Sequence, residues 1–397
     1  MPSQAPVILC VASHLKGMHF MKEAHRLGCR VFLLTHANLL EAPWPRQALE
    51  GVYALPDFAD MAAVRHAVSY LYRSVKFDKL VPMGDYDVEV TADLREHLRL
   101  PGMGVTASRY FRDKLAMRDR TQSHGIPVPA FTGLLHDADV AAFTRQVPAP
   151  WVLKPRAEAG SKGIQVLHDT DSLWRALDEL GDTRSHHLLE RFVEGDIFHV
   201  DSVVHEGRVV FASAQRYGRP ILSLKQGGGV YSTRTIERGT REERALQDTN
   251  RRVITALGMP QGVTHIEYIH DPATGEFLFL EAAARVGAAK ISDVIYYATG
   301  VCLWHEWAKL EAATPTNPYV PPVPAADHAG VVITVAHQAR PDYGRYRDSE
   351  IVWRQSTRSH HAGLLVKSPD WGRVESLVLD YEGRMAAEYA AQPALAH

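Results

Sequence analysis

Apolar residues near the start of the chain alternate between short continuous runs and helical patterns. Residues 7–12 and 30–34 are runs typical of buried strands, and residues 17–27 between them carry apolar side chains at helical spacing. A further helix is predicted over 61–72. Strand–helix–strand alternation favours a parallel sheet with right-handed crossovers. The pattern therefore predicts an N-terminal α/β domain over residues 1–109.

A different pattern follows a helix predicted over residues 108–123. From residue 151 to 282, the predicted strands come in pairs joined by short turns, which is typical of antiparallel hairpins. The predicted fold class is therefore α/β plus α+β. A proline-rich stretch at 313–329 precedes a C-terminal segment of irregular pattern. The predicted hairpins are 151–153 with 163–167, 197–204 with 208–214, and 264–269 with 276–282.

Composition and charge narrow the classes of function. The 397 residues carry a formal net charge of −2, and no basic excess is available to neutralise a nucleic-acid backbone. The longest apolar runs fall far short of the ~20 residues that a membrane helix needs. Cys10, Cys29 and Cys302 form no metal-binding pattern and indicate reduced thiols. We expect a cytoplasmic protein with neither a nucleic-acid nor a membrane partner.

Lys154 ends an apolar strand and is followed by Pro155 and a glycine-bearing turn at 159–164. Such a turn offers backbone N–H groups to phosphate oxygens, and Lys154 and Lys162 would add positive charge. The pattern differs from that of a P-loop. The alternative is a surface hairpin whose Lys154 extends to solvent, and the segment alone does not decide between the two.

A second candidate segment, residues 187–196, is a strand that leads into a turn rich in carboxylates. Backbone groups at 190–193 can meet the edge of a base, and an acidic group just beyond them can accept hydrogen bonds from ribose hydroxyls. Taken alone, the segment is more typical of an ordinary strand and turn.

The hairpin at 264–282 carries the third pattern. Because strand side chains alternate between faces, His265 and Glu267 share one face, and Phe279 and Glu281 are predicted to share a face of the return strand. If the turn centres on Thr274, the two glutamates lie directly opposite one another. Carboxylates that close repel unless a cation lies between them, and oxygen ligands suit Mg²⁺. A register slip of one residue would separate them. The alternative, a pair of solvated edge glutamates, is rejected because apolar residues at 278–280 precede Glu281 and a buried carboxylate needs a partner.

In this order, the three patterns resemble the ATP-grasp superfamily, and most of all its carboxylate–amine ligases, the branch of the L-amino acid ligases. The resemblance covers roughly residues 110–310. It implies a Rossmann-like (pre-ATP-grasp) N-terminal domain, followed by a two-subdomain ATP-grasp fold with antiparallel sheets. The implied parts are the N-terminal domain at 1–109, a small subdomain at 110–190, a large subdomain at 191–312, and a C-terminal segment at 313–397 that packs on the large subdomain.

The resemblance also implies roles for residues. Glu267 and Glu281 match ligands of Mg²⁺, with Mn²⁺ as a possible substitute, and the catalytic residues would be Arg285, Lys154 and His265. The residues expected to hold ATP lie on one helix and three turns: Lys114, Lys154, Gly160, Ser161, Lys162, Gly163, Glu190, Val193 and Asp196.

Two departures from the family pattern matter. Ala283 stands where many members carry an asparagine that binds metal, which keeps open a nucleotide-binding protein with little turnover. Ile197 stands at the position where the family usually has a ribose-binding acid, so that Glu194 or Asp196 would have to take over this role.

The implied activity is an ATP-dependent ligation of a carboxylate and an amine, both small molecules, through an acyl-phosphate. A carboxylase or a purine-pathway ligase is the alternative within the superfamily. The loops at 160–163 and 224–229 are candidate lids that exclude water. A homodimer is expected from the family.

Three further features are less clear in the sequence. His265 faces either the metal and the second substrate or the core. His199 and Asp201 share one face of another strand and receive no role. Asp85 or Tyr86, after a predicted strand end, is a candidate for contacting a substrate amino group.

Overall fold

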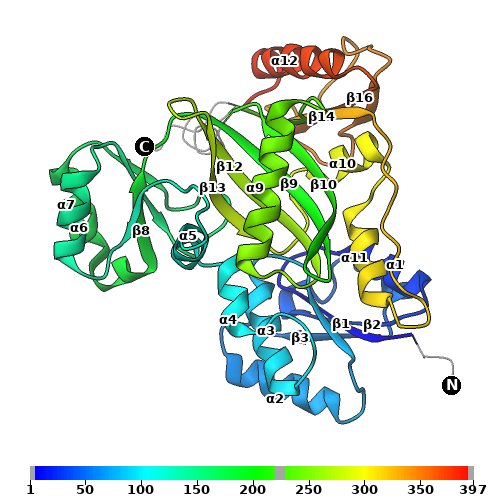
Figure 1. The fold of residues 1–397 in the computed structure, drawn as a ribbon. Helices are drawn as coiled ribbons and strands as arrows, with labels where there is room; N and C mark the ends of the chain where they lie inside the picture. Colours follow the sequence, from blue (N-terminus) through cyan, green and yellow to red (C-terminus); the bar gives the residue numbers. More distant parts are fainter. Residues whose placement is uncertain (1–4, 220–228, 392–397) are drawn as a thin grey trace.

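The computed structural model describes residues 5–219 and 229–391 of the chain, which contain three sheets (Figure 1). The N-terminal sheet is parallel, with strand order β3-β2-β1-β4, as its strand–helix alternation predicts. Its elements are β1 (Val7–Ala12), α1 (Met18–Arg26), β2 (Arg30–His36), β3 (Gly51–Leu55), α2 (Met61–Tyr72), β4 (Lys79–Pro82), α3 (Asp87–Leu98) and the short α4 (Val105–Ser108).

Strand β1 is apolar throughout because both of its faces are covered. Ile8 packs in one apolar cluster with Phe20 of α1, and Leu9 packs in another with Val64 of α2. Strands of parallel sheets that are buried on both sides read as continuous apolar runs. The carboxyl ends of β1 and β4, which are neighbours in the sheet, therefore open on one edge of this domain.

The second sheet has the order β5-β8-β6-β7 and lies to the left in Figure 1, with α6 (Asp137–Gln146) and α7 (Thr170–Leu180) on its outer side. All of its strand pairs are antiparallel. Its elements are α5 (Lys114–Gln122), β5 (Phe131–Gly133), α6 (Asp137–Gln146), β6 (Trp151–Pro155), β7 (Gln165–Leu167), α7 (Thr170–Leu180) and β8 (His187–Arg191).

The single helix predicted over 108–123 is wrong. Helix α4 ends at Ser108, and α5 begins only at Lys114. The reason is Asp113, whose backbone is extended and therefore interrupts the helix. Its side chain caps the new helix by accepting hydrogen bonds from the N–H groups of Leu115 and Ala116. The new start makes Lys114 the first residue of α5.

The third sheet has the order β13-β12-β9-β10-β11-β14-β16-β15 and is antiparallel throughout. Helix α9 crosses one of its faces in the centre of Figure 1. Its elements are β9 (Asp196–His205), β10 (Arg208–Tyr217), β11 (Val230–Thr235), α9 (Arg241–Leu257), β12 (Gly262–Asp271), β13 (Glu276–Ala283), α10 (Ile291–Thr299), α11 (Leu303–Ala312), β14 (His328–Val335), β15 (Ile351–Arg354), β16 (His361–Ser368) and α12 (Trp371–Glu388).

The C-terminal segment, whose pattern is irregular, is a continuation of this sheet. Strand β14 pairs with β11, and β16 and β15 follow outside it. Helix α12 covers this end, with Val378 and Tyr381 in one apolar cluster with Val332 of β14. The linker-like prolines thus separate two parts of a single sheet.

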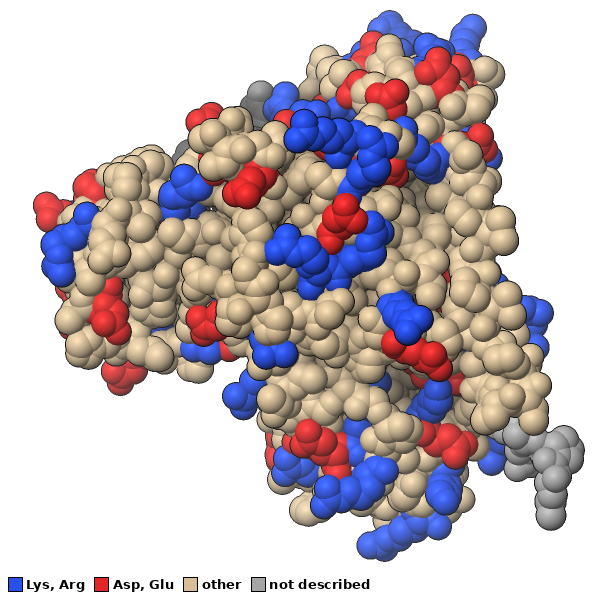
Figure 2. Space-filling model, viewed as in Figure 1, with Lys and Arg blue, Asp and Glu red and all other residues tan. Residues whose placement is uncertain are grey.

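The helices and the surface charge of the described residues bear on the partners that the protein can have. No helix in the described part of the chain has the length and apolar character needed to cross a membrane. The face drawn in Figure 2 carries basic and acidic side chains side by side, with basic groups gathered over α9.

Candidate active site

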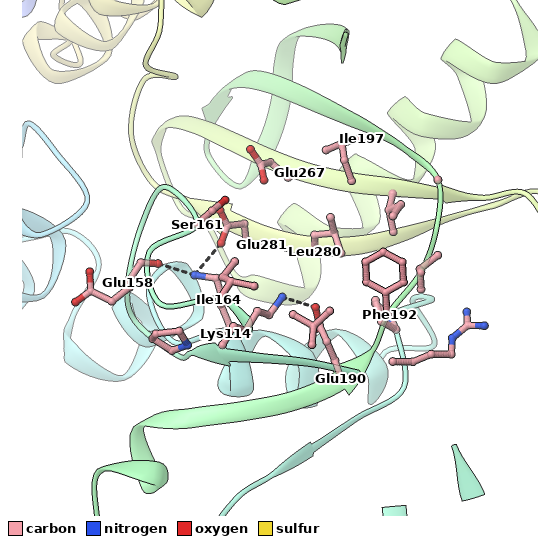
Figure 3. A pocket seen from close by; sticks show the side chains of 18 of the residues that line it. Lys114, Glu158, Ser161, Ile164, Glu190, Phe192, Ile197, Glu267, Leu280 and Glu281 are labelled. Atoms are coloured by element: carbon pink, nitrogen blue, oxygen red, sulfur yellow. Dashed lines mark hydrogen bonds and ion pairs between the residues drawn. The ribbon is translucent and has the colours of Figure 1, made fainter. Parts of the chain in front are cut away.

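A cavity of about 370 Å³ lies between the small sheet and the β12–β13 edge of the large one (Figure 3). Strands β6 and β8 line one side of it, and β12 and β13 line the other. The predicted site residues that line this cavity are Lys114, Lys154, Ser161, Lys162, Glu190, Val193, Glu267 and Glu281. Segments that lie more than 160 residues apart in the sequence thus contribute to one space.

A buried charge cluster forms the side of the cavity next to the small sheet. Lys154 Nζ contacts Glu190 Oε1, and Arg118 Nη2 lies 3.0 Å from Glu190 Oε2. Burial lowers the pKa of the Lys154 ammonium, although Glu190 opposes this. Burial by itself would raise the pKa of Glu190, but Lys154 and Arg118 hold it below its ordinary value. Both carboxylate oxygens of Glu190 are therefore occupied by cations.

Arg118 is a site residue that sequence reasoning missed. It lies four residues after Lys114 on α5, a spacing that puts both on one helix face, and this spacing was the available signal. The side chain of Arg118 is fully buried, and its second terminal nitrogen donates to the carbonyl oxygen of Leu280 on β13. It therefore ties the small sheet to the hairpin of the large one.

Lys114 bridges the loop after β6 and the hairpin. Its Nζ donates to the carbonyl oxygen of Glu158 at 2.7 Å and lies 2.8 Å from Glu281 Oε2. The nearby turn has positive φ at Gly160, Ser161 and Gly163. This left-handed backbone suits glycine and bends the chain so that Ser161 and Lys162 line the cavity.

The register of β12 and β13 pairs Glu267 directly with Glu281. The predicted turn centred on Thr274 is not the cause, because Asp271 pairs with Glu276 beside the turn, and this register alone would place Leu280 opposite Glu267. The predicted sharing of a face by Phe279 and Glu281 is wrong. A bulge leaves Leu280 unpaired between the pairs Glu267–Glu281 and Tyr268–Phe279. Phe279 is consequently buried in the core, while Leu280 and Glu281 both line the cavity (Figure 3).

Glu267 is held from one side. The Tyr217 hydroxyl donates to its Oε1 at 2.8 Å, and His265 Nε2 lies 3.4 Å from the same oxygen. Burial by itself would raise the pKa of Glu267, but its contacts with His265 and Tyr217 hold this pKa below its ordinary value. Within the described residues, Oε2 of Glu267 and Oε1 of Glu281 have no hydrogen-bond or ion-pair partner.

Arg285 lies outside the cavity lining and joins the hairpin to the N-terminal domain. Its Nε donates to Asp85 Oδ2 at 2.8 Å, across 200 residues of sequence. Asp85 follows the carboxyl end of β4, and Tyr86 beside it donates to Glu158 Oε2 at 3.1 Å. Although burial would raise the pKa of Asp85, Arg285 holds it below its ordinary value.

Some predicted site residues lie elsewhere. Asp196 points to Arg216 on the surface, at 2.7 Å, and the neighbouring Glu194 lines the cavity instead. The reason is strand alternation: Asp196 and Ile197 begin β9 on opposite faces, and Ile197 faces the cavity. His265 is buried behind Glu267 and outside the cavity lining. Residues 224–228 of the second candidate lid lie outside the described residues.

Comparisons with known proteins agree with this geometry. Residues 21–102 match a model of the ATP-grasp N-terminal domain, and residues 111–288 match a model of the ATP-grasp domain. The chain belongs to the ATP-grasp family. The ATP-grasp fold predicted from the sequence is thereby confirmed. Similarity to L-amino acid ligases confirms the predicted carboxylate–amine ligase branch.

Two relatives in sequence and one solved structure show what this chain is similar to. An L-arginine-specific L-amino acid ligase of Bacillus subtilis is 24% identical over 288 residues, which are 71% of this chain and 69% of that enzyme. A D-alanine–D-alanine ligase of Chromohalobacter salexigens is 28% identical over 190 residues, 45% of this chain and 57% of that one. The crystal structure of an L-amino acid ligase from Bacillus licheniformis superposes with a TM-score of 0.75 at 21% identity, covering 96% of this chain and 98% of that one.

ATP-grasp enzymes use ATP with Mg²⁺, and the residues present fit both. The hairpin presents two carboxylates side by side, each with one oxygen without a protein partner among the described residues, and Mg²⁺ prefers such ligands. Lys114, Lys154 and Lys162 line the same cavity and match the charge of a polyphosphate.

Proposed function

We propose that this ATP-grasp protein uses ATP to join the carboxylate of an amino acid to an amine through an acyl-phosphate. The observation that carries the proposal is the pairing of Glu267 with Glu281 at the edge of a cavity that also holds Lys114 and Lys154. A paired set of carboxylates with cations opposite them suits a nucleotide triphosphate with its divalent ion.

The nucleotide is proposed to lie along the cavity from β8 to the hairpin. Val193 would offer its backbone groups to the base, because the N–H groups of Arg191 and Phe192 already donate to backbone carbonyls. The Glu190 side chain is paired with Lys154 and Arg118. The phosphates would lie toward Lys114 and the loop of Ser161 and Lys162, where ammonium groups and backbone N–H groups offset their charge.

Phosphoryl transfer is proposed to occur at the hairpin. A Mg²⁺ ion held by Glu267 and Glu281, with Mn²⁺ as a proposed substitute, would supply neutralisation of the phosphate charge. Lys114, which contacts Glu281, adds a second cation at this point. A carboxylate oxygen of the substrate attacks the γ-phosphorus, the bond to the β-phosphate oxygen breaks, and ADP and the acyl-phosphate form.

Amide formation follows from the reactivity of this mixed anhydride. The neutral amine attacks the acyl carbon, a tetrahedral oxyanion forms, the bond to the phosphate oxygen breaks, and the nitrogen loses its proton. Arg285 is proposed to bind the acyl-phosphate, since Asp85 fixes its guanidinium near the hairpin and leaves other N–H groups for an anion. His265 is enclosed between carboxylates, so we assign proton transfer from the amine to no protein residue.

Recognition of the amino acid is proposed for the strand ends of the N-terminal domain. Asp85, Lys16 and Arg285 lie together there, and burial followed by the charge of Arg285 lowers the pKa of Lys16. Two cations and a carboxylate match the two charged groups of an amino acid. Ligands of open α/β sheets commonly bind beyond the carboxyl ends of the strands.

Product analysis tests the proposal directly. The protein is incubated with ATP, Mg²⁺ and pairs of amino acids, and phosphate release and new amides are measured by colorimetry and mass spectrometry. The expected result is phosphate release that needs both an acid and an amine, together with the condensed product. Nucleotide binding without turnover for any pair would instead favour the reading that Ala283 suggests, a nucleotide-binding protein with little activity. Turnover with bicarbonate would favour a carboxylase.

The proposal also includes a homodimer, a cytoplasmic location and the four-part division of the chain at residues 109, 190 and 312. Sedimentation equilibrium tests the dimer. Limited proteolysis tests the division, with cleavage expected first in the exposed connections nearest these boundaries, since residue 190 itself lies in the buried strand β8.

A further inference from the structure

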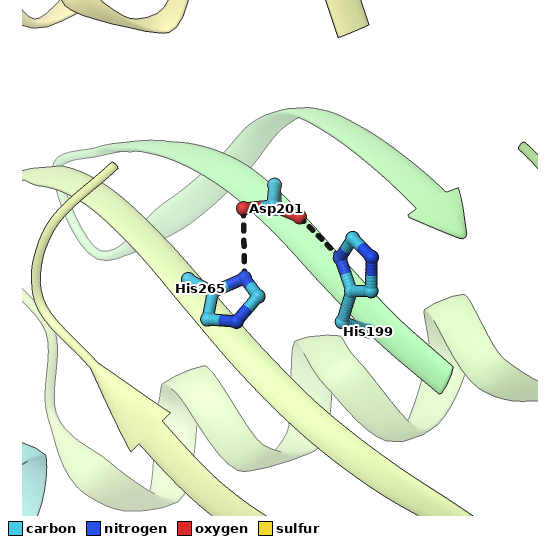
Figure 4. Close-up of side chains that lie close together, drawn as sticks. All are labelled: His199, Asp201 and His265. Atoms are coloured by element: carbon cyan, nitrogen blue, oxygen red, sulfur yellow. Dashed lines mark hydrogen bonds and ion pairs between the residues drawn. The ribbon is translucent and has the colours of Figure 1, made fainter. Parts of the chain in front are cut away.

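A buried cluster of His199, Asp201 and His265 lies on the neighbouring strands β9 and β12 of the large sheet (Figure 4). Asp201 and His199 are two residues apart on β9, and the register of β9 and β12 places His265 opposite Asp201. Asp201 Oδ2 lies 2.7 Å from His199 Nδ1, and Asp201 Oδ1 lies 3.0 Å from His265 Nδ1. One carboxylate therefore holds two imidazoles.

The distances describe hydrogen bonds rather than a set of metal ligands. An ionised carboxylate only accepts, so both Nδ1 atoms must carry protons, and a protonated nitrogen has no lone pair for a metal. His199 is completed on its other side, where Nε2 lies 2.8 Å from the Thr233 hydroxyl oxygen. The nitrogens and the carboxylate thus satisfy one another without an ion.

The free end of this network reaches Glu267. His265 Nε2 lies 3.4 Å from Glu267 Oε1 and 3.5 Å from the Tyr217 hydroxyl, which itself donates to the same Oε1. Both contacts fall on one oxygen of the carboxylate, and they come from strands on either side of β9. Oε2 is left for another ligand.

We propose that Asp201 is a positioning residue, which fixes His265 so that His265 and Tyr217 together hold Oε1 of Glu267 and keep Oε2 for the divalent ion. The inference rests on the proposed function, because it takes Glu267 as a ligand of that ion. Outer-shell partners of metal-binding side chains fix the orientation of the ligand, and their loss commonly weakens metal binding by about 10–100-fold. His199 and Thr233 support Asp201 from the opposite side.

The test measures ion binding without the ligation reaction. Mn²⁺ is titrated into the full-length protein with saturating ADP, and free Mn²⁺ is followed by electron paramagnetic resonance. Asp201→Asn removes the charge at the hub, and Tyr217→Phe removes one hydroxyl at the ligand. Both are expected to weaken Mn²⁺ binding, by about 10–100-fold for Asp201→Asn, while the affinity for ADP in EDTA stays at the wild-type value.

The matched control is Tyr268→Phe. Tyr268 is also a buried tyrosine, adjacent to Glu267 on β12 but on the opposite face, and its hydroxyl donates to Asn250 at 2.9 Å. Its loss removes a hydrogen bond of the same kind without touching the network. Mn²⁺ affinity is expected to be unchanged in this variant.

The outcomes distinguish a failure of the positioning role of Asp201 from a failure of the proposed function. Mn²⁺ binding by the wild-type protein that Tyr217→Phe and a folded Asp201→Asn leave unchanged overturns the positioning role. If Asp201→Asn does not fold, Tyr217→Phe decides the question alone. One metal ion per chain that survives dialysis and is lost in Asp201→Asn also overturns it, because the cluster would then itself be a metal site. No Mn²⁺ binding by the wild type with ADP refutes the proposed function as well.

Discussion

Glu190→Gln should loosen the small sheet, because it leaves two buried cations without their counter-ion. Glu190 is the shared partner of Lys154 and Arg118, whose side chains are 8% and 0% exposed. Removing one partner of a buried ion pair typically costs about 3–5 kcal/mol, since the remaining charge stays desolvated. At about 1.4 kcal/mol per power of ten, this cost would make local opening roughly 10²- to 4 × 10³-fold more frequent.

Hydrogen exchange with mass spectrometry measures this change where it occurs. A chain with three sheets need not unfold in one step, so a local measurement is more informative than a global midpoint. Peptides that cover β6 and β8 are expected to exchange faster in the variant by the factor above, while peptides from the N-terminal sheet keep their protection.

Asp196→Asn is the matched control for this prediction. It removes a carboxylate only six residues further along, but from an exposed pair with Arg216 whose side chains are 36% and 52% exposed. Such a pair contributes about 0–1 kcal/mol, and exchange in β6 and β8 should barely change. Wild-type exchange rates for β6 and β8 in Glu190→Gln would refute the argument that Lys154 and Arg118 depend on this carboxylate.

Three further predictions concern the hairpin, the N-terminal contact and the C-terminal region. Glu281→Gln should abolish Mg²⁺-dependent turnover with an unchanged circular dichroism spectrum; full activity would mean that the metal assignment is wrong. Asp85→Asn should lower kcat/KM for the acid substrate by about 100-fold, because Arg285 loses its orientation, while ADP affinity measured by calorimetry is retained; an equal loss of ADP affinity would contradict this. The hydrogen bond from Arg373 lowers the pKa of Glu350 from 4.5 to about 2, so its stabilisation is complete above pH 4.5 and is lost as the pH falls toward 2. As the pH falls from 4.5 to about 2, β15 and α12 should therefore lose less hydrogen-exchange protection in Glu350→Gln than in the wild type. The same loss of protection in both proteins would count against the ion pair.

Much of the arrangement follows from local pattern alone. The alternation of strands and helices specifies the N-terminal sheet, because a strand covered on both faces must be apolar throughout. The hairpin of β12 and β13 is similarly accessible, since two strand patterns flank a short turn. The register beside that turn would by itself place Leu280 opposite Glu267, and it is the bulge that brings Glu281 there. The bulge at Leu280 was not accessible, because strict alternation carries no sign of an inserted residue.

The sequence by itself determined the kinds of chemistry available: lysines at a strand end and in a glycine turn, and two carboxylates on one hairpin. Only the tertiary structure decided how these groups are held. Arg118 meets Glu190 across 72 residues, Asp85 meets Arg285 across 200, and Asp201 meets His265 across 64. Such contacts depend on how separate sheets and helices pack against each other, and periodicity within any one segment carries no information about that packing.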